Sequence, residues 1–199
     1  MNYEFHYIQG KDAVRLDMIH KLERPLDQGT VAEICGSLDI SRQTFYNYFA
    51  SKTQMVHWYL TFLSQFYLAS IGRSYTWREG LRKTLQLCQH EQASLTRCLP
   101  RSKSGASAIK SLYDLQLFWI RLRVDQIKQV LGGRDVADGT IALVHYAEVY
   151  VAAEASLLYG WIAEDMAVSG EEVADFIAGC VPPMLYQELS LQVCVHVKR

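Results

Sequence analysis

The chain has 199 residues, half of them apolar, and a formal net charge of −1 at pH 7. This apolar content is sufficient for a sizeable core, and the length allows one moderate domain or a small domain followed by a larger one. The near-neutral charge excludes a basic surface over the whole chain. The five cysteines are odd in number and form no Cys-x-x-Cys pair, which argues against a disulfide framework and a zinc site.

The N-terminal residues lack a basic start followed by an apolar run, so we expect no signal peptide. The first predicted helix covers 11–22, and Pro25 ends it. Its apolar residues recur at helical spacing, and those expected to face inward are Val14, Met18, Ile19 and Leu22.

The segment 30–52 predicts two short helices joined by a tight turn, with a further helix beginning at its end. Thr30 followed by Glu33 has the spacing of a capping box. The residues 37–40 break the helical pattern, and Ser41 is expected to cap the second helix. This arrangement predicts a helix-turn-helix, whose second helix enters the major groove of DNA.

The second helix of this motif has an apolar inner face, formed by Phe45 and Phe49, and an outer face without acidic residues. Arg42 can donate two hydrogen bonds to guanine, and Gln43 can pair with adenine. Lys52, at a helix N-terminus, can contact a phosphate. The predicted DNA-binding residues are Thr30, Ser41, Arg42, Gln43, Thr44, Tyr46, Asn47, Tyr48 and Lys52.

This motif resembles the N-terminal part of the tetracycline-repressor (TetR) family of bacterial transcription regulators. The positions that carry the resemblance are Thr30, Val31, Ile34, Tyr46, Phe49 and Lys52. Cys35 and Asp39 depart from the family pattern, which usually has Ala and Gly there, although Asp tolerates a left-handed backbone better than most residues. The resemblance implies a cytoplasmic, bacterial homodimer that binds a near-palindromic operator in double-stranded DNA.

The remainder of the chain predicts helix after helix, and therefore an all-α fold with a helix-turn-helix domain at 1–54 and a dimerisation and effector-binding domain at 55–199. Ser51 is expected to cap a helix that begins at Lys52. Further helices are expected over 77–89, up to Cys98, and from about 107 to the glycine pair at 132–133, after a loop at 100–105.

The segment 140–164 is apolar on nearly all sides, and a helix of this kind is buried on two sides. We expect a second subunit to cover one of them. His145, Glu148 and Glu154 make a membrane span costly, so we expect no membrane partner. With the Ser169 cap that follows, the family resemblance implies a dimer through helices within 140–190. The proline pair 182–183 is expected to separate a last helix, 184–195.

The sequence contains no catalytic motif, and we expect no enzyme activity, no cofactor and no metal site. A second set of aromatic and polar residues either fills the core or lines an effector pocket between the helix that starts at Lys52 and the helices after Ser107. The residues of this set are Trp58, Phe62, Phe66, Tyr113, Trp119, His145 and Tyr146.

From these features we expect a homodimeric transcription regulator that a small molecule releases from DNA, and we favour a repressor over an activator. Two alternatives remain open. The weak basic charge of the N-terminal part favours a TetR-like co-regulator that acts through a partner protein. The second alternative is a helical small-molecule-binding or enzymatic domain in which the helix-turn-helix is incidental.

Overall fold

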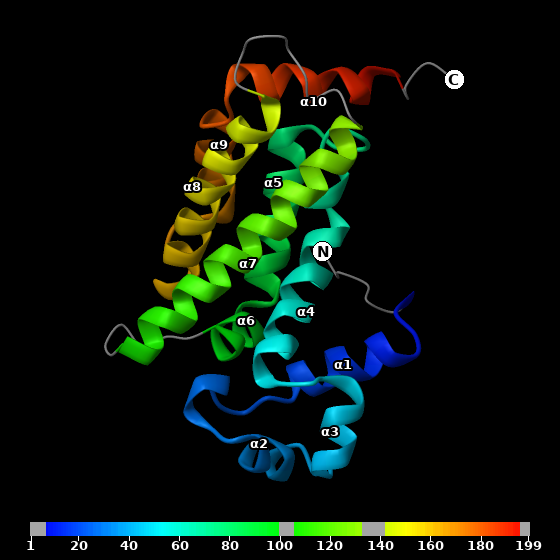
Figure 1. The fold of residues 1–199 in the computed structure, drawn as a ribbon, viewed down its shortest axis with the longest axis vertical. Coiled ribbons are helices and arrows are strands. Elements are labelled where there is room, and N and C mark those ends of the chain that lie inside the picture. The colour runs from blue at the N-terminus through cyan, green and yellow to red at the C-terminus, as the bar shows by residue number, and fades with distance from the viewer. Residues whose placement is uncertain (1–6, 100–105, 133–141, 196–199) are drawn as a thin grey trace.

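A computed structural model describes residues 7–99, 106–132 and 142–195 of the chain, and the elements within these ranges are helices. The all-helical fold class predicted from the sequence is confirmed. The N-terminal helices form a small unit at one end of the molecule, here called the head (Figure 1). Its elements are α1 (Lys11–His20), η2 (Leu26–Gln28), α2 (Val31–Ser37) and α3 (Arg42–Tyr48).

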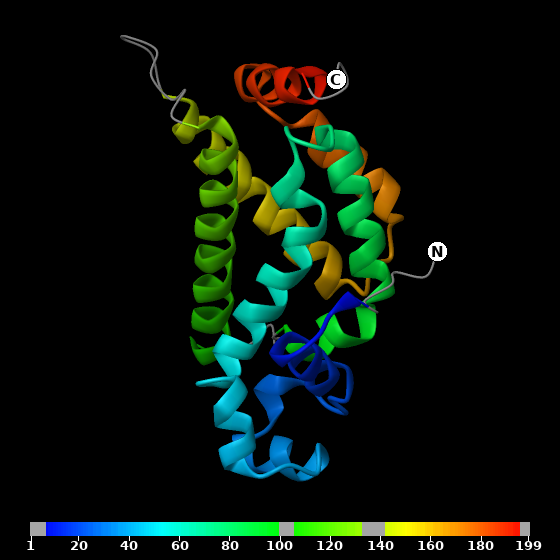
Figure 2. The same ribbon diagram turned by 90° about the vertical axis from the view of Figure 1, so that its right-hand side faces the viewer.

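The remaining helices form a larger unit, here called the body, and α4 runs from the head into it (Figure 1). Figure 2 shows α7 and α5 on opposite sides of α4, with α10 across the end farthest from the head. The elements of the body are α4 (Lys52–Phe66), η3 (Leu68–Ser70), α5 (Trp77–His90), α6 (Gln92–Cys98), α7 (Ala106–Leu131), α8 (Leu143–Ala163), α9 (Gly170–Gly179) and α10 (Pro183–Val195).

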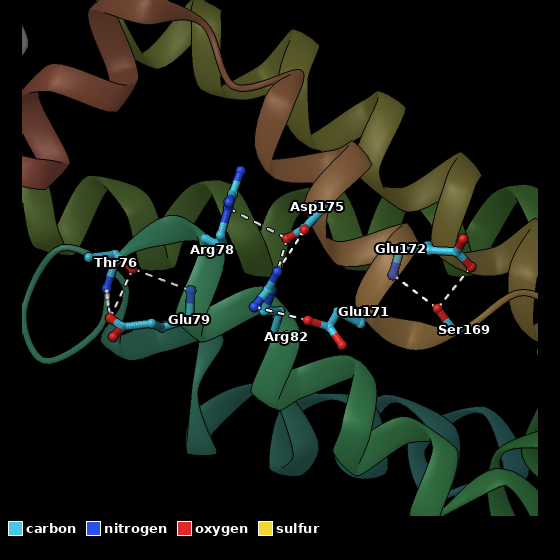
Figure 3. Close-up of polar contacts among 8 residues, drawn as sticks. All are labelled: Thr76, Arg78, Glu79, Arg82, Ser169, Glu171, Glu172 and Asp175. Carbon is cyan, nitrogen blue, oxygen red and sulfur yellow. Dashed lines mark hydrogen bonds and ion pairs between the residues drawn. The ribbon is translucent and has the colours of Figure 1, made fainter.

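Side-chain caps fix the starts of several helices, because they satisfy amide groups that have no partner within the helix. The Ser51 hydroxyl accepts a hydrogen bond from the amide of Gln54, at 3.1 Å, at the start of α4. Thr76 and Glu79 form a capping box at the start of α5, and Ser169 caps α9 (Figure 3). The caps predicted at Ser51 and Ser169 are confirmed.

Two helix ends also follow their sequence signals. Gly132 has a φ of 59° and follows the last residue of α7, in the left-handed conformation that glycine adopts without strain. The proline pair separates α9 from α10 as predicted. The predicted loop 100–105 and Gly133 lie outside the described residues.

The prediction for the first helix was wrong in two details. α1 ends at His20, so Leu22 belongs to the loop after the helix, and its side chain is buried there. Val14, in the first turn of α1, is exposed instead of facing inward.

α5 and α9 pack closely and are joined by ion pairs (Figure 3). The Arg82 guanidinium donates hydrogen bonds to both carboxylate oxygens of Asp175, at 2.9 and 2.7 Å, and lies 3.1 Å from Glu171. A Cβ atom on Gly170 would lie 2.7 Å from the side-chain oxygen of Gln89, so a larger residue there would displace the Gln89 side chain. These contacts hold α9 firmly against α5.

A buried polar network joins three helices in the core. Arg123 of α7 donates a hydrogen bond to Glu154 of α8, at 3.0 Å, and the two side chains are 1% and 0% exposed. The Trp119 indole donates to the same carboxylate at 3.2 Å. Arg123 also donates to Gln126, whose amide donates to Ser64 of α4. The network therefore fixes α4, α7 and α8 relative to one another.

Among the described helices, none has both the length and the apolar character needed to cross a lipid bilayer.

Candidate nucleic-acid interface and adjoining cavity

The capping box predicted at the start of α2 is present. The Thr30 hydroxyl accepts a hydrogen bond from the amide of Glu33, at 3.3 Å, and the Glu33 carboxylate accepts one from the amide of Thr30, at 2.7 Å. The second of these bonds is the main reason that the pKa of Glu33 is lowered. The hydroxyl of Thr30 also donates to this carboxylate, at 2.8 Å. Thr30 thus stabilises the first turn of α2 and is itself exposed to solvent.

The turn between α2 and α3 depends on Asp39, which has a φ of 53°. This is the left-handed conformation that Asp tolerates better than most residues, as the sequence led us to expect. The amide of Ile40 then donates to the carbonyl of Cys35, at 3.0 Å, which closes the turn. Ser41 caps α3 through the amide of Thr44, at 2.9 Å. The turn therefore sets the direction in which α3 leaves α2.

α3 has one buried and one exposed face. Phe45 and Phe49 are buried in the core, as predicted. The outward face has no acidic side chain and carries the long hydrogen-bond donors Arg42 and Gln43. The predicted DNA-binding residues that are exposed are Thr30, Ser41, Arg42, Gln43, Tyr46 and Asn47, and those that are half-buried are Thr44, Tyr48 and Lys52.

Lys52 has partners inside the head. Its ammonium group donates hydrogen bonds to the backbone carbonyls of Leu26, at 2.6 Å, and Gly29, at 2.5 Å. These carbonyls belong to η2 and the residue that follows it, so Lys52 attaches the start of α4 to the segment before α2. The sequence motif suggested a phosphate contact for Lys52 and gave no sign of these bonds.

Arg15 of α1 supports α3 and was missed by the sequence reasoning. Its guanidinium donates a hydrogen bond to the carbonyl of Tyr48, at 3.2 Å. It also lies over the rings of Phe49 and Trp58, 5.8 and 5.6 Å from their centres, at cation–π distance. Arg15 therefore joins α1 to the end of α3 and to α4. No local pattern marks this role, because Tyr48 is 33 positions away in the sequence, and Phe49 and Trp58 are farther still.

The fold and the exposed face of α3 define a helix-turn-helix protein. Residues 22–57 match the family model described as "Bacterial regulatory proteins, tetR family". The head is thus similar to the DNA-binding domain of TetR-family regulators, as its sequence motif suggested, and the match runs from Leu22, after α1, into the first turns of α4. No curated protein matches the chain.

The body contains a small apolar cavity with a volume of about 60 Å³. It lies between α4 and the helices α5 to α8, in the region predicted for an effector. Its walls include Leu60, Leu63, Cys88, Leu95, Trp119 and Leu158. Small-molecule pockets are usually about 300–1,000 Å³. The cavity therefore has to widen before it can hold a molecule of ordinary effector size.

Of the seven residues predicted for the effector site, only Trp119 lines this cavity. Trp58, Phe62 and Phe66 instead form a row of ring contacts along α4. They are spaced four residues apart and so lie on a different face of α4 from Leu60 and Leu63. Tyr113 and His145 are exposed, and Tyr146 is half-buried. The structure thus does not bring the seven residues together.

Within the described ranges, no group of three or more His, Cys, Asp or Glu side chains is placed to hold a metal ion. The pKa of the Cys88 thiol at the cavity wall is raised to about 12 by burial, so this thiol is protonated at neutral pH and is a poor nucleophile.

Proposed function

We propose that this protein is a cytoplasmic, homodimeric transcriptional repressor that binds a near-palindromic operator through α3 and is released by a small-molecule effector. The observation that carries the proposal is the exposed, acid-free face of α3 in a head of the TetR family. Arg42 and Gln43 are the residues of this face that we assign to base edges. Tyr46 and Asn47, also exposed, are assigned to the DNA backbone or neighbouring bases.

The decisive experiment measures binding of the intact protein to the DNA upstream of its own gene and to a library of genomic fragments. Arg42→Ala should weaken binding to the selected operator by about 1–3 kcal/mol per half-site and relax the base preference at one position. Arg121→Ala is the matched control, because Arg121 is an exposed arginine of α7 in the body.

Three outcomes are distinguishable. Salt-sensitive, sequence-selective binding that Arg42→Ala weakens supports the proposal. The absence of binding to every fragment contradicts it and favours a co-regulator that acts through a partner protein. Binding that Arg42→Ala and Arg121→Ala change equally contradicts the role assigned to α3.

The dimer is proposed to form through an apolar face on α8 and α9. Val149 of α8 is 74% exposed and Phe176 of α9 is 60% exposed, and exposed apolar surface that is contiguous marks interaction sites. A groove of about 510 Å³ runs between the two helices and is lined by residues that include Ser156, Leu157, Gly160 and Phe176. A second copy presenting the same face would cover these side chains around a two-fold axis.

The effector is proposed to enter the apolar cavity by widening it. An effector acts only if it binds the DNA-incompetent arrangement more tightly, and a roughly hundredfold preference supplies about 2.7 kcal/mol of coupling. A screen of uncharged apolar compounds should therefore find molecules that raise the melting temperature and lower operator affinity together. If no compound changes either quantity, the regulator does not respond to a small molecule of this kind.

A further inference from the structure

A buried carboxylate lies where the head meets the body. Glu91, between α5 and α6, is only 4% exposed. One of its oxygens, Oε2, accepts hydrogen bonds from His20 Nε2, at 2.7 Å, and from the Tyr59 hydroxyl, at 2.5 Å. Its other oxygen lies 3.3 Å from Nδ1 of His90. A single carboxylate therefore bonds to side chains of α1, α4 and α5.

These partners belong to both units of the molecule. His20 is the last residue of α1 in the head, whereas Tyr59 is a fully buried residue of α4. α6 contacts both α1 and η2, and Figure 2 shows α1 directly beside α6. α6 therefore makes one of the contacts that set the position of the head on the body, next to Glu91.

The carboxylate is held in its ionised form. Burial raises the pKa of Glu91, but the hydrogen bonds from His20 and Tyr59 outweigh burial and leave the pKa below its ordinary value. Hydrogen bonds to an ionised acceptor are shorter and stronger than those between neutral groups. Removing a donor from a buried carboxylate leaves that group under-satisfied. The arrangement therefore favours one position of α1 relative to α4 and α6.

The same segment forms a wall of the cavity. Cys88 and Leu95, about one helical turn before and after Glu91, both line the cavity, and so does Leu60, next to Tyr59 in α4. A molecule that widens the cavity must move some of these walls, because about 60 Å³ is too little space for it. Such a movement would displace the carboxylate or its donor on α4.

We propose that Glu91 is a positioning residue that fixes the orientation of the head on the body, and that a molecule filling the cavity acts on the head by displacing this carboxylate. The first half stands on the contacts of Glu91 alone, and the second half rests on the proposed function. Glu91 has no part in contacting DNA or the effector.

The test measures the head-to-body distance directly, without DNA. Spin labels are placed on cysteines at Gly36 of α2, where a side chain meets no other atom, and at the exposed Arg121 of α7. The background carries Cys180→Ser and Cys194→Ser, and an excess of unlabelled protein removes distances between protomers. Pulsed electron resonance then gives the distance distribution in the folded protein.

His20→Leu and Glu91→Leu should shift or broaden this distribution, whereas His20→Gln, which keeps a hydrogen-bond donor, should preserve it. Asp175→Asn is the matched control, because it removes a carboxylate from the α5–α9 ion pairs without touching the head (Figure 3). If Glu91→Leu does not fold, His20→Leu and Tyr59→Phe carry the test. An unchanged distribution in folded His20→Leu would overturn the proposal.

The cavity half is tested with Ala155→Leu, whose added carbons enter the cavity from α8. The variant should shift the distribution in the same direction as His20→Leu, and the two substitutions together should shift it no further. Additive shifts, or no shift from Ala155→Leu or the smaller Ala155→Val, would overturn this half. Operator binding is measured separately on wild-type protein, so a failure to bind DNA removes the proposed function and leaves the distance result standing.

Discussion

Arg123 and Glu154 are removed from water almost completely, and each is the other's charged partner. Breaking a buried ion pair on one side usually costs about 3–5 kcal/mol, because the remaining charge has no compensation. We therefore expect Glu154→Ala to lower the free energy of unfolding by about this amount in denaturant titrations. Asp125→Ala, at an exposed acid of α7, should stay within about 0.5 kcal/mol of wild type.

Replacing both members of the pair by apolar residues, as in Arg123→Met with Glu154→Leu, should restore much of this loss. A single Glu154→Ala variant as stable as wild type would show that water reaches Arg123 in solution.

Lys52 has two backbone carbonyls as partners, and this gives it a role in stability. Lys52→Ala should lower the free energy of unfolding by about 1–2 kcal/mol, a value reduced for partial exposure. The control is Lys128→Ala on the exposed face of α7, which should have little effect. Thermal or chemical unfolding measures both variants.

The phosphate contact predicted for Lys52 is decided by the salt dependence of DNA binding. If the ammonium group stays with the carbonyls, Lys52→Ala should leave the slope of log K against log salt unchanged. A slope reduced by about one would mean that Lys52 turns to a phosphate when DNA is bound.

At the scale of the helix, the sequence was most informative where the signal is local. The Thr30 and Ser169 caps and the left-handed Asp39 turn each depend on residues within a few positions, and they form as predicted. The position of side chains around a helix was harder to predict. Trp58 and Leu60 are both apolar residues of α4, and only the packing of α5 to α8 decides which of them reaches the cavity.

Contacts between segments far apart in the sequence could not be predicted, because no local sequence pattern marks the residues that form them. Glu91 and His20 are separated by 71 positions, and neither residue lies in a motif. The hydrogen bonds from Lys52 to η2 could not be predicted either. A lysine at the start of a helix is expected to face solvent or a phosphate.

The exposed face of α8 and α9 allows a sharper test of dimer formation than the sequence did. Ala155 is buried against the cavity, so a charge there would disturb the fold of one protomer. Ser156, the next residue, is exposed and lines the groove. Ser156→Arg should therefore give a folded monomer with weaker operator binding, measured by light scattering and circular dichroism.

Gln129→Arg places the same charge on an exposed site of α7 and should remain a dimer. If wild-type protein is a strict monomer at micromolar concentration, the proposed two-fold arrangement is wrong. If Ser156→Arg stays dimeric, the dimer forms through another face.

For the whole molecule, the contacts between head and body predict a dependence of stability on pH. The folded-state pKa of Glu91 is lowered, so its contribution to stability is present above its unfolded-state pKa of about 4.3 and is lost as the pH falls through the folded value. Wild type should be more stable than Glu91→Gln at about pH 6, and the difference should shrink towards about pH 3.5. Denaturant titrations at several pH values measure it, and a constant difference would contradict the ionised state.

α8 has a further consequence for the assembled protein, because one side of it lines the cavity and the adjacent side lines the groove between α8 and α9. Leu158 and Leu157 are neighbours in sequence, yet one faces the interior and the other the surface where we propose the second copy binds. In the proposed dimer, a ligand that widens the cavity of one protomer would therefore push on a helix that the other protomer also contacts. The two binding events would then not be independent, and we expect the response of the proposed dimer to effector concentration to be cooperative.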